Sequence, residues 1–465
     1  MKKVFLVACC WVLVTGISAQ TVTQRLQKAF TAFEKDEQLK HAISSLYVID
    51  AKTGKVVFDQ NSQIGLAPAS TQKIITAVTA FELLGKDYRY KTELGYTGNI
   101  KTDTLQGNLY IKASGDPTFG SWRYANATDS AIKRKWAVAL NKTGIRIVTG
   151  ILTGNYNDYS HKSIPDGWIW QDIGNYYGAP ADILNWKENQ FDIELQSGSE
   201  VGSEVKILGS NLNYFNELKA APKGTGDNAY AYIYQGMKNP LIAGTIPVDE
   251  KSFKISVSDP DAVTNAFLEL SISLGIKSDR VHKSVFVSPN NFSLLDMNPK
   301  NYSVITIHYS PSLDSIIYWF NKKSINLYGE ALIKTFAYEK QGFGSTDSGI
   351  SIVKKFWKGK GIDKDELNIY DGSGLSPQNR VTTHAQVEIL KYAKTKDWFP
   401  YFYDALPEYN GMKMKSGTIR DVKGFCGYHK ATNGKEYIFS FLVNNYNGKT
   451  SGVVNKMYKV LDELK

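Results

Sequence analysis

One stretch of this chain, residues 92–261, lacks the helical pattern that the segments before and after it carry. It consists of short strand-like runs separated by Gly, Asn and Tyr. Apolar residues at helical spacing precede it, as in 74–84, and return from Ala262 onward; this periodicity is typical of packed helices. The sequence therefore predicts an α/β (α+β) body, 20–91 plus 262–465, interrupted by a mostly β insert of one or two subdomains.

Strands and helices are both expected in the body. A helix at 22–39 precedes two strands, 42–50 and 55–59, and a buried helix begins near Ser70 after a Pro-containing loop. Strand-like sequence fills 413–444, where an Asn-Gly pair signals a hairpin. The other helices are predicted at 262–275, 313–322, 327–339, 348–357, 383–394 and 453–464.

Composition narrows the class of protein without giving a function. The chain has 465 residues, of which 42% are hydrophobic and 22% charged, as in globular proteins and unlike disordered or fibrous ones. The net charge of +10 comes from scattered lysines and arginines, so a nucleic-acid partner is not expected. An acidic polymer or an anionic membrane surface suits such a charge equally well.

The beginning of the chain has the pattern of an export signal. Two lysines precede an apolar run that is too short to span a membrane, and small residues end at Ala19. We expect a signal peptide over 1–19, cleaved near Ala19, and a mature protein in the periplasm or cell envelope. Residues 6–9 resemble a lipoprotein processing box, so lipidation of Cys9 is an open alternative.

No metal or other cofactor is expected. The chain has three cysteines, and cleavage near Ala19 leaves Cys426 alone, which excludes an intramolecular disulfide and a Cys-ligated zinc site. The six histidines show no paired metal-ligand spacing.

Residues 70–73, Ser-Thr-Gln-Lys, have the Ser-x-x-Lys spacing of serine acyl-transfer enzymes. Residues three apart share one face of a helix, so an uncharged Lys73 could take the proton of the Ser70 hydroxyl. The same spacing recurs at 130/133, 203/206 and 351/354. Ser70 differs from these because it follows a Pro loop at the start of an apolar helix. Ser70 and Lys73 are therefore the candidate nucleophile and base.

Two later triplets could complete an acyl-transfer site. Residues 324–326, Ser-Ile-Asn, offer a hydroxyl and an amide at a helix connection, and 415–418, Lys-Ser-Gly-Thr, offer a cation and hydroxyls on a strand. Each triplet alone is a weak signal because similar ones occur at 288–290, 52–54 and 142–144. The order of the motifs along the chain, 70–73, then 324–326, then 415–418, favours these two triplets over the similar ones.

These motifs, taken together, resemble the D-alanyl-D-alanine carboxypeptidase/endopeptidase family of class C low-molecular-mass penicillin-binding proteins. The resemblance extends from about residue 40 to the end and includes four more blocks: 115–118, 167–172, 177–180 and 371–376. It implies a penicillin-binding-protein/β-lactamase-like transpeptidase fold, with the long insert between the Ser-x-x-Lys and Ser-x-Asn motifs.

The resemblance also implies roles for the motif residues. Ser70 would attack the carbonyl between two D-alanines to give an acyl-enzyme, with Lys73 as its base. Ser324 would pass a proton to the departing D-alanine, and Asn326 would hold the substrate amide and orient Lys73. Lys415 would supply positive potential for the substrate's terminal carboxylate and keep the Lys73 proton mobile.

The strand motif would also bind the substrate. Thr418, with Ser416 and Gly417, would hold the terminal carboxylate, and the backbone N–H groups of Ser70 and Thr418 would form the oxyanion hole. The family resemblance further places Asp172 near the cleft. Ser416 stands where the family usually has Thr, which keeps the hydroxyl. The apolar middle residue of 324–326 should point away from the chemistry.

The function expected from this resemblance is a serine-type D-Ala-D-Ala carboxypeptidase or DD-endopeptidase. Its substrates would be peptidoglycan stem peptides, β-lactams would be covalent inhibitors, and the protein would associate peripherally with the cell envelope. Two alternatives stay open: a non-catalytic penicillin-binding sensor that keeps the fold, and a β-lactamase, which the long insert disfavours.

Several other residues receive a structural interpretation. His308 is expected to be structural rather than catalytic, and Cys426 to be a buried hydrophobe. The glycine-containing segment 371–374 is expected to be a scaffold turn beside the site. Core packing is expected for an aromatic group in the insert: Trp168, Trp170, Tyr176 and Tyr177.

Overall fold

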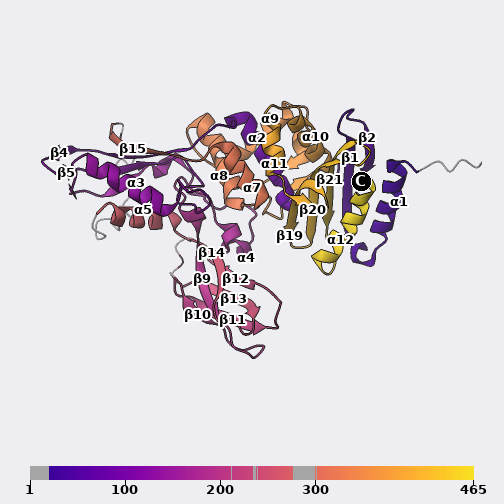
Figure 1. The fold of residues 1–465 in the computed structure, drawn as a ribbon, viewed down its shortest axis with the longest axis horizontal. Coiled ribbons are helices and arrows are strands. Elements are labelled where there is room, and N and C mark those ends of the chain that lie inside the picture. Colours follow the sequence, from indigo (N-terminus) through magenta and orange to yellow (C-terminus); the bar gives the residue numbers. More distant parts are fainter. Residues whose placement is uncertain (1–19, 211, 234–236, 238, 276–298, 300) are drawn as a thin grey trace, which may run out of the picture.

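A computed structural model describes residues 20–210, 212–233, 237, 239–275, 299 and 301–465. The predicted signal peptide over 1–19 and the alternative of Cys9 lipidation concern residues outside these ranges, as does the triplet 288–290. The described chain is elongated, with a sheet and its helices at one end, more helices in the middle, and β-rich parts beyond (Figure 1). No helix in the described ranges is long and apolar enough to cross a lipid bilayer.

A six-stranded antiparallel sheet forms the centre of the body, in the order β18-β19-β20-β21-β1-β2. Its central strands are buried along nearly their whole length, because helices cover both faces. Its strands are β1 (Ile43–Asp50), β2 (Val56–Gln60), β18 (Glu408–Tyr409), β19 (Met412–Ile419), β20 (Val422–Lys430) and β21 (Glu436–Asn444).

Two helices from opposite ends of the chain cover one face of this sheet. They are α1 (Val22–Glu34) and α12 (Thr450–Leu461), which lie beside each other at one end of the molecule (Figure 1). Phe30 and Phe33 of α1 pack against Phe441 of β21. The expected first helix ends earlier than predicted, and a short 3-10 turn, Glu37–Leu39, follows it.

The other face of the sheet carries the remaining helices of the body, around a large apolar core. Among them, α2 and α8 pack against each other, and α10 packs on the sheet through β1 and β21. These helices are α2 (Lys73–Leu84), α7 (Leu313–Lys322), α8 (Asn326–Gln341), α9 (Thr346–Lys358), α10 (Thr383–Lys394) and α11 (Phe399–Ala405). A small pair of strands, β16 (Leu367–Asn368) and β17 (Arg380–Val381), precedes α10.

The first part of the insert contains more helix than the sequence predicted. The helix α3 (Asp129–Lys142) begins at a Thr128 side-chain cap and buries Ile132, Trp136 and Leu140 along one face. The spacing of these three residues is helical, but Gly- and Asn-rich neighbours obscure it. The strands around it are β3 (Lys91–Tyr96), β4 (Asn99–Lys101), β5 (Thr104–Gln106), β6 (Leu109–Lys112), β7 (Ile147–Val148) and β8 (Leu152–Gly154).

Two elements that the sequence analysis assigned to the body pack on the insert instead. The helix α5 (Ala262–Ser273) shares an apolar core with α3 through Phe267 and Leu270. The strand β15 (Ser303–Tyr309) pairs with β3 at the edge of the sheet β15-β3-β6-β8. The sequence boundary at residue 261 marks the return of the helical pattern, whereas both α5 and β15, which follow it, pack on the insert.

The second part of the insert is a separate β lobe with its own apolar core. Two three-stranded sheets, β10-β9-β14 and β11-β13-β12, enclose this core, and the lobe projects from the long axis of the molecule (Figure 1). Its strands are β9 (Gln190–Gln196), β10 (Lys206–Gly209), β11 (Phe215–Ala221), β12 (Asn228–Tyr232), β13 (Leu241–Pro247) and β14 (Phe253–Ser258).

Candidate active site

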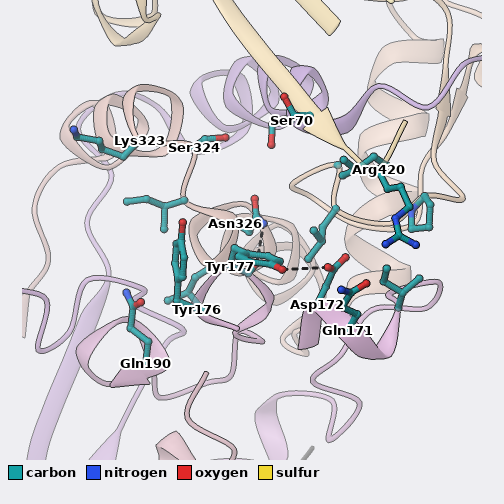
Figure 2. Close-up of a pocket in the computed structure, with 18 of the residues that line it drawn as sticks. Ser70, Gln171, Asp172, Tyr176, Tyr177, Gln190, Lys323, Ser324, Asn326 and Arg420 are labelled. Carbon is teal, nitrogen blue, oxygen red and sulfur yellow. Dashed lines mark hydrogen bonds between the residues drawn. The ribbon is translucent and has the colours of Figure 1, made fainter. Parts of the chain in front are cut away.

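A cleft of about 670 Å³ lies where the body meets the insert. Ser70, Ser324, Asn326 and Thr418 line it from the body. In Figure 2, Ser70 and Ser324 lie on one side of the cleft, and Asp172 extends from the insert on the other. The insert contributes Arg123, Ile169, Gln171, Asp172, Tyr176, Tyr177, Glu188, Gln190 and Tyr230.

Ser70 lies on a tight 3-10 turn, Ala69–Gln72, directly before α2 rather than inside that helix. Ala69 has a φ of 46°, a conformation that L-residues rarely adopt. Two glycines allow the surrounding chain to approach this turn. A Cβ on Gly374 would lie 1.9 Å from the Ala69 carbonyl oxygen, and one on Gly417 would lie 2.9 Å from the Ser70 nitrogen. The turn therefore holds Ser70 by backbone contacts.

The Lys73 amine is fully buried and has three hydrogen-bond partners. Its Nζ lies 2.9 Å from Ser70 Oγ, 2.6 Å from Asn326 Oδ1 and 2.8 Å from the Ser373 carbonyl oxygen. Burial, and then the Lys415 cation, hold the pKa of Lys73 well below its usual range. A neutral amine has two N–H donors and one lone pair, and carbonyl oxygens only accept. When the amine is neutral, Asn326 and Ser373 can take its two N–H groups, which leaves the lone pair for the Ser70 hydroxyl.

Asn326 is the first residue of α8 and joins the body to the insert. Its Oδ1 accepts from Lys73, and its Nδ2 donates to the Tyr177 carbonyl oxygen at 2.7 Å (Figure 2). This contact between Lys73 and Asn326 is the one expected if Asn326 orients the Lys73 amine. One Nδ2 proton points to Tyr177, which leaves the other for the predicted contact with a substrate amide.

Ser324 and Lys415 form a second contact beside the first. Ser324 lies between α7 and α8 with a φ of 57°, and its Oγ accepts from Lys415 Nζ at 3.0 Å. Lys415 also donates to the Ser416 carbonyl oxygen at 2.7 Å. Burial lowers the pKa of Lys415 to about 7. A proton can thus be exchanged between Lys415 and the Ser324 hydroxyl near neutral pH.

The edge of β19 forms the wall next to Ser70. Gly417 lies against the Ser70 turn, and Thr418 lines the cleft. The Ser416 and Thr418 hydroxyls both accept from Lys423 Nζ, at 2.7 and 2.8 Å. The sequence analysis did not single out Lys423, because it lies beyond the motif on the neighbouring strand.

Asp371 holds the loop behind Lys73 in place. The sequence predicted a scaffold turn at 371–374, and the structure shows that this turn also contacts Lys73 through the Ser373 carbonyl oxygen. The Asp371 carboxylate is completely buried and bridges several chain segments. The Asp371 side chain accepts from Gln72 Nε2, Trp168 Nε1, Asn379 Nδ2, Gly374 N and Ser376 N.

Glu330, which the sequence analysis missed, lies in the same buried layer. It is on α8 and accepts from the Gly372 N–H with both carboxylate oxygens, at 3.2 and 3.1 Å. Burial, and then the Asp371 charge, raise the pKa of Glu330 to about 8. A glutamate among the apolar residues of a buried helix was the signal that could have found it.

The insert wall carries Asp172, which faces the cleft as the resemblance implied. Tyr177 donates its hydroxyl to Asp172 at 3.3 Å, and burial raises the pKa of the Asp172 carboxyl. Core packing holds for Trp168, which is 8% exposed, but is wrong for Trp170 and Tyr176, which are each 54% exposed. Tyr176 lines the cleft, whereas the Trp170 ring packs edge-on against Tyr232 of β12.

Two residues with a structural interpretation lie away from the cleft lining. His308 is buried on β15 with its ring edge-on to Phe119, and burial lowers its pKa to about 4. Cys426 is buried in β20, and burial raises its pKa to about 12. Within the described ranges, no group of three or more His, Cys, Asp and Glu side chains has the arrangement of a metal site.

Comparisons with known proteins identify the family of this chain. The family model of the D-Ala-D-Ala carboxypeptidase 3 (S13) family matches residues 26–408. The chain belongs to this family. The serine carboxypeptidase class and the penicillin-binding-protein-like fold that the sequence predicted are thereby confirmed.

Individual members of the family cover nearly the whole chain. A D-alanyl-D-alanine carboxypeptidase of Actinomadura sp. (strain R39) is 25% identical over 91% of this chain and 81% of its own length. The D-alanyl-D-alanine carboxypeptidase DacB of Haemophilus influenzae is 25% identical over 84% of this chain and 83% of its own. The crystal structure of penicillin binding protein 4 from Haemophilus influenzae superposes with a TM-score of 0.77 at 21% identity, covering 94% of this chain and 99% of that one.

Proposed function

We propose that this protein removes the terminal D-alanine from peptidoglycan stem peptides through an acyl-enzyme on Ser70, and that β-lactams acylate the same serine. The same chemistry would cut D-Ala-containing cross-bridges, since both reactions break an amide on the carboxyl side of D-alanine. The observation that carries the proposal is the Lys73 contact pattern: its buried amine lies 2.9 Å from the Ser70 hydroxyl, and its other two partners are oxygens that only accept. From the predicted export signal, we further propose that the reaction takes place in the periplasm or cell envelope.

The first half-reaction follows from this geometry. Lys73 takes the Ser70 proton as Oγ attacks the carbonyl carbon of the penultimate D-alanine. The oxyanion forms against the backbone N–H groups of Ser70 and Thr418, whose strand passes the Ser70 turn at Gly417. The C–N bond then breaks, and the departing D-alanine nitrogen takes a proton from Ser324, which Lys415 resupplies.

The second half-reaction regenerates the enzyme. The proton that Lys73 took from Ser70 first passes to Lys415, so that Lys73 is neutral and Lys415 charged again. A water molecule then attacks the acyl carbonyl and gives a proton to Lys73. The bond between the acyl carbon and Ser70 Oγ breaks, Ser70 takes that proton back from Lys73, and the shortened peptide leaves. Asp172 and the neighbouring insert residues line the cleft opposite Ser70 and Ser324. We infer that they contact the stem peptide ahead of the two D-alanines.

Labelling with a fluorescent penicillin tests the nucleophile. We expect a covalent band in the wild type, none in Ser70→Ala, and a labelling rate at least about 10³-fold lower in Lys73→Met, because nucleophile and base act as a unit. Ser351→Ala is a matched control, because Ser351 and Lys354 have the same spacing on an exposed helix face. That variant should label like the wild type.

Product analysis separates the proposed reaction from its alternatives. Release of free D-alanine from a pentapeptide by the wild type, absent in Ser70→Ala, would support the carboxypeptidase. Penicillin labelling without any D-alanine release would support the non-catalytic sensor. Rapid turnover of a chromogenic cephalosporin would support a β-lactamase.

A further inference from the structure

A buried lysine without an acidic partner lies directly behind the hydroxyl groups of the motif strand. Lys423 is on β20 and is 6% exposed. Its Cα partner across the sheet is Thr418, so the two side chains extend from the same face. Ser416 lies two residues before Thr418 on that face. Among the described residues, no Asp or Glu side chain is in salt-bridge contact with Lys423, whose ammonium instead lies 4.7 Å from the Phe425 ring centroid.

We propose that Lys423 is the cation of the carboxylate subsite and acts through the hydroxyls of Ser416 and Thr418. This makes it a positioning and charge-supplying residue that selects substrates whose departing amino acid carries a free α-carboxylate. The inference rests on the proposed function and adds to it the part of the chain that recognises the leaving group.

The hydrogen-bond roles support this assignment. An ammonium group only donates, so the Ser416 and Thr418 oxygens must accept from Lys423 at 2.7 and 2.8 Å. Each hydroxyl then directs its own proton elsewhere, and a hydroxyl that accepts from a cation is a stronger donor. Thr418 lines the cleft, so its outward proton is available there. A carboxylate only accepts and therefore matches these donors.

The charge of Lys423 also supports its assignment to the carboxylate subsite. A buried charge without a partner is unfavourable, and an anionic ligand at the two hydroxyls would supply the missing counter-charge. Burial lowers the pKa of Lys423 to about 8, so the side chain remains mostly protonated at neutral pH. Lys423 therefore provides a fixed positive charge where the substrate would bring a negative one.

Other cations near the cleft are less suited to this role. Lys415 already donates to Ser324 and to the Ser416 carbonyl oxygen. Lys323 and Arg420 line the cleft but are exposed, and water weakens the attraction between exposed charges. In Figure 2 the Lys323 ammonium points away from Ser70.

The test compares two substrates that differ only at the carboxyl terminus. One is an acylated peptide ending in D-Ala-D-Ala with a free carboxylate, and the other is the same peptide ending in D-Ala-D-Ala amide. In Lys423→Met we expect kcat/KM for the acid to fall by about tenfold to a hundredfold, the range of a lost charge-assisted interaction. The amide should change by less than about threefold, since it brings no charge.

Three variants keep the result interpretable. Lys323→Met and Arg420→Met also remove a cleft cation and should lower acid and amide turnover alike. Ser416→Ala/Thr418→Val removes the two hydroxyls and leaves the lysine. This double variant should lose the preference for the acid over the amide. Adding Lys423→Met to it should lower that preference little further, because the three groups act as one unit. If Lys423→Met does not fold, Lys423→Arg is compared in its place; it keeps the charge and should retain the acid-to-amide preference.

Each outcome has a definite meaning. Equal losses of kcat/KM for the acid and the amide in Lys423→Met would show that Lys423 has only a structural role and would overturn the inference. Loss of the preference for the acid in Arg420→Met alone would overturn it as well. Wild-type protein that releases no D-alanine from the acid substrate would contradict the proposed function itself, and with it this inference.

Discussion

The environment of two lysines, at the scale of single residues, determines how the reaction should depend on pH. Burial holds the pKa of Lys73 well below its usual range and that of Lys415 at about 7. Lys73 must be neutral to accept the Ser70 proton, so acylation should rise with pH as Lys73 loses its proton. Lys415 must be charged to supply its proton, so acylation should fall as pH increases beyond about 7.

We therefore expect a bell-shaped profile for the second-order rate of penicillin acylation, measured from about pH 5 to about pH 10. The two apparent pKa values belong to the coupled pair rather than to either lysine alone. In Lys415→Met the alkaline limb should disappear. A rate that is flat with pH, or that keeps rising above pH 8, would contradict these roles.

Asp371 provides a second prediction at this scale. Its carboxylate is surrounded by N–H donors from the Ser70 turn, the insert and its own loop. In Asp371→Asn one oxygen becomes an NH₂ group that faces donors, and each buried unsatisfied group costs about 1–3 kcal/mol. We expect a lower melting temperature and at least about tenfold slower penicillin acylation. Asp365→Asn, at an exposed carboxylate, should change neither quantity.

The approach of β19 to the Ser70 turn is the critical contact at the scale of secondary-structure elements. A Cβ on Gly417 would lie 2.6 Å from the Pro68 carbonyl oxygen and 2.9 Å from the Ser70 nitrogen, and backbone atoms cannot move aside as a flexible side chain can. Gly417→Ala should therefore displace the nucleophile and slow penicillin acylation by about 10²-fold, the effect of misplacement by roughly 1 Å. Gly209→Ala, on an open position in β10, is the control and should label at the wild-type rate.

The sequence predicted most of the elements of the body and the residues that meet in the cleft, but not how they meet. The Ser70 helix was expected to begin at Ser70, whereas the 3-10 turn at Ala69–Gln72 intervenes. A turn of this kind is stabilised by tertiary contacts with Gly374 and Gly417, which local propensity does not encode. The helix α3 and the packing of α5 and β15 on the insert were missed for a related reason, because their burial depends on partners distant in the sequence.

The cleft is shared between two parts of the chain at the scale of the whole molecule. Asn326 of the body donates a hydrogen bond to the Tyr177 carbonyl oxygen of the insert. Asp371 of the body accepts one from the Trp168 indole of the insert. The motif residues were identifiable from their spacing together with the family resemblance. These two connections were not, since the sequence separates their partners by well over a hundred residues. The insert is therefore part of the site and more than an appended domain.

Deleting the β lobe tests directly what the insert contributes to the site. Gln190 at the start of β9 is the antiparallel Cα partner of Ser258 at the end of β14, and such partners lie about 5 Å apart. Residues 191–257 can thus be replaced by a two-residue Gly-containing link without moving the flanking chain. The Ser70, Lys73 and Asn326 contacts lie outside the deleted segment, so penicillin acylation should remain within about threefold of the wild type.

Peptide turnover should respond differently, because Tyr230 of the lobe lines the cleft and Ala231 donates to the Asn175 side chain behind the Asp172 wall. We expect kcat/KM for a muropeptide pentapeptide to fall by at least about tenfold, and that for a short D-Ala-D-Ala peptide to fall much less, since only the longer substrate reaches that wall. Deleting the exposed turn 223–226 is the control, because it shortens the same lobe at a point outside the cleft lining. Equal losses for both peptides, accompanied by slower penicillin acylation, would show instead that the lobe supports the catalytic groups and does not select the substrate.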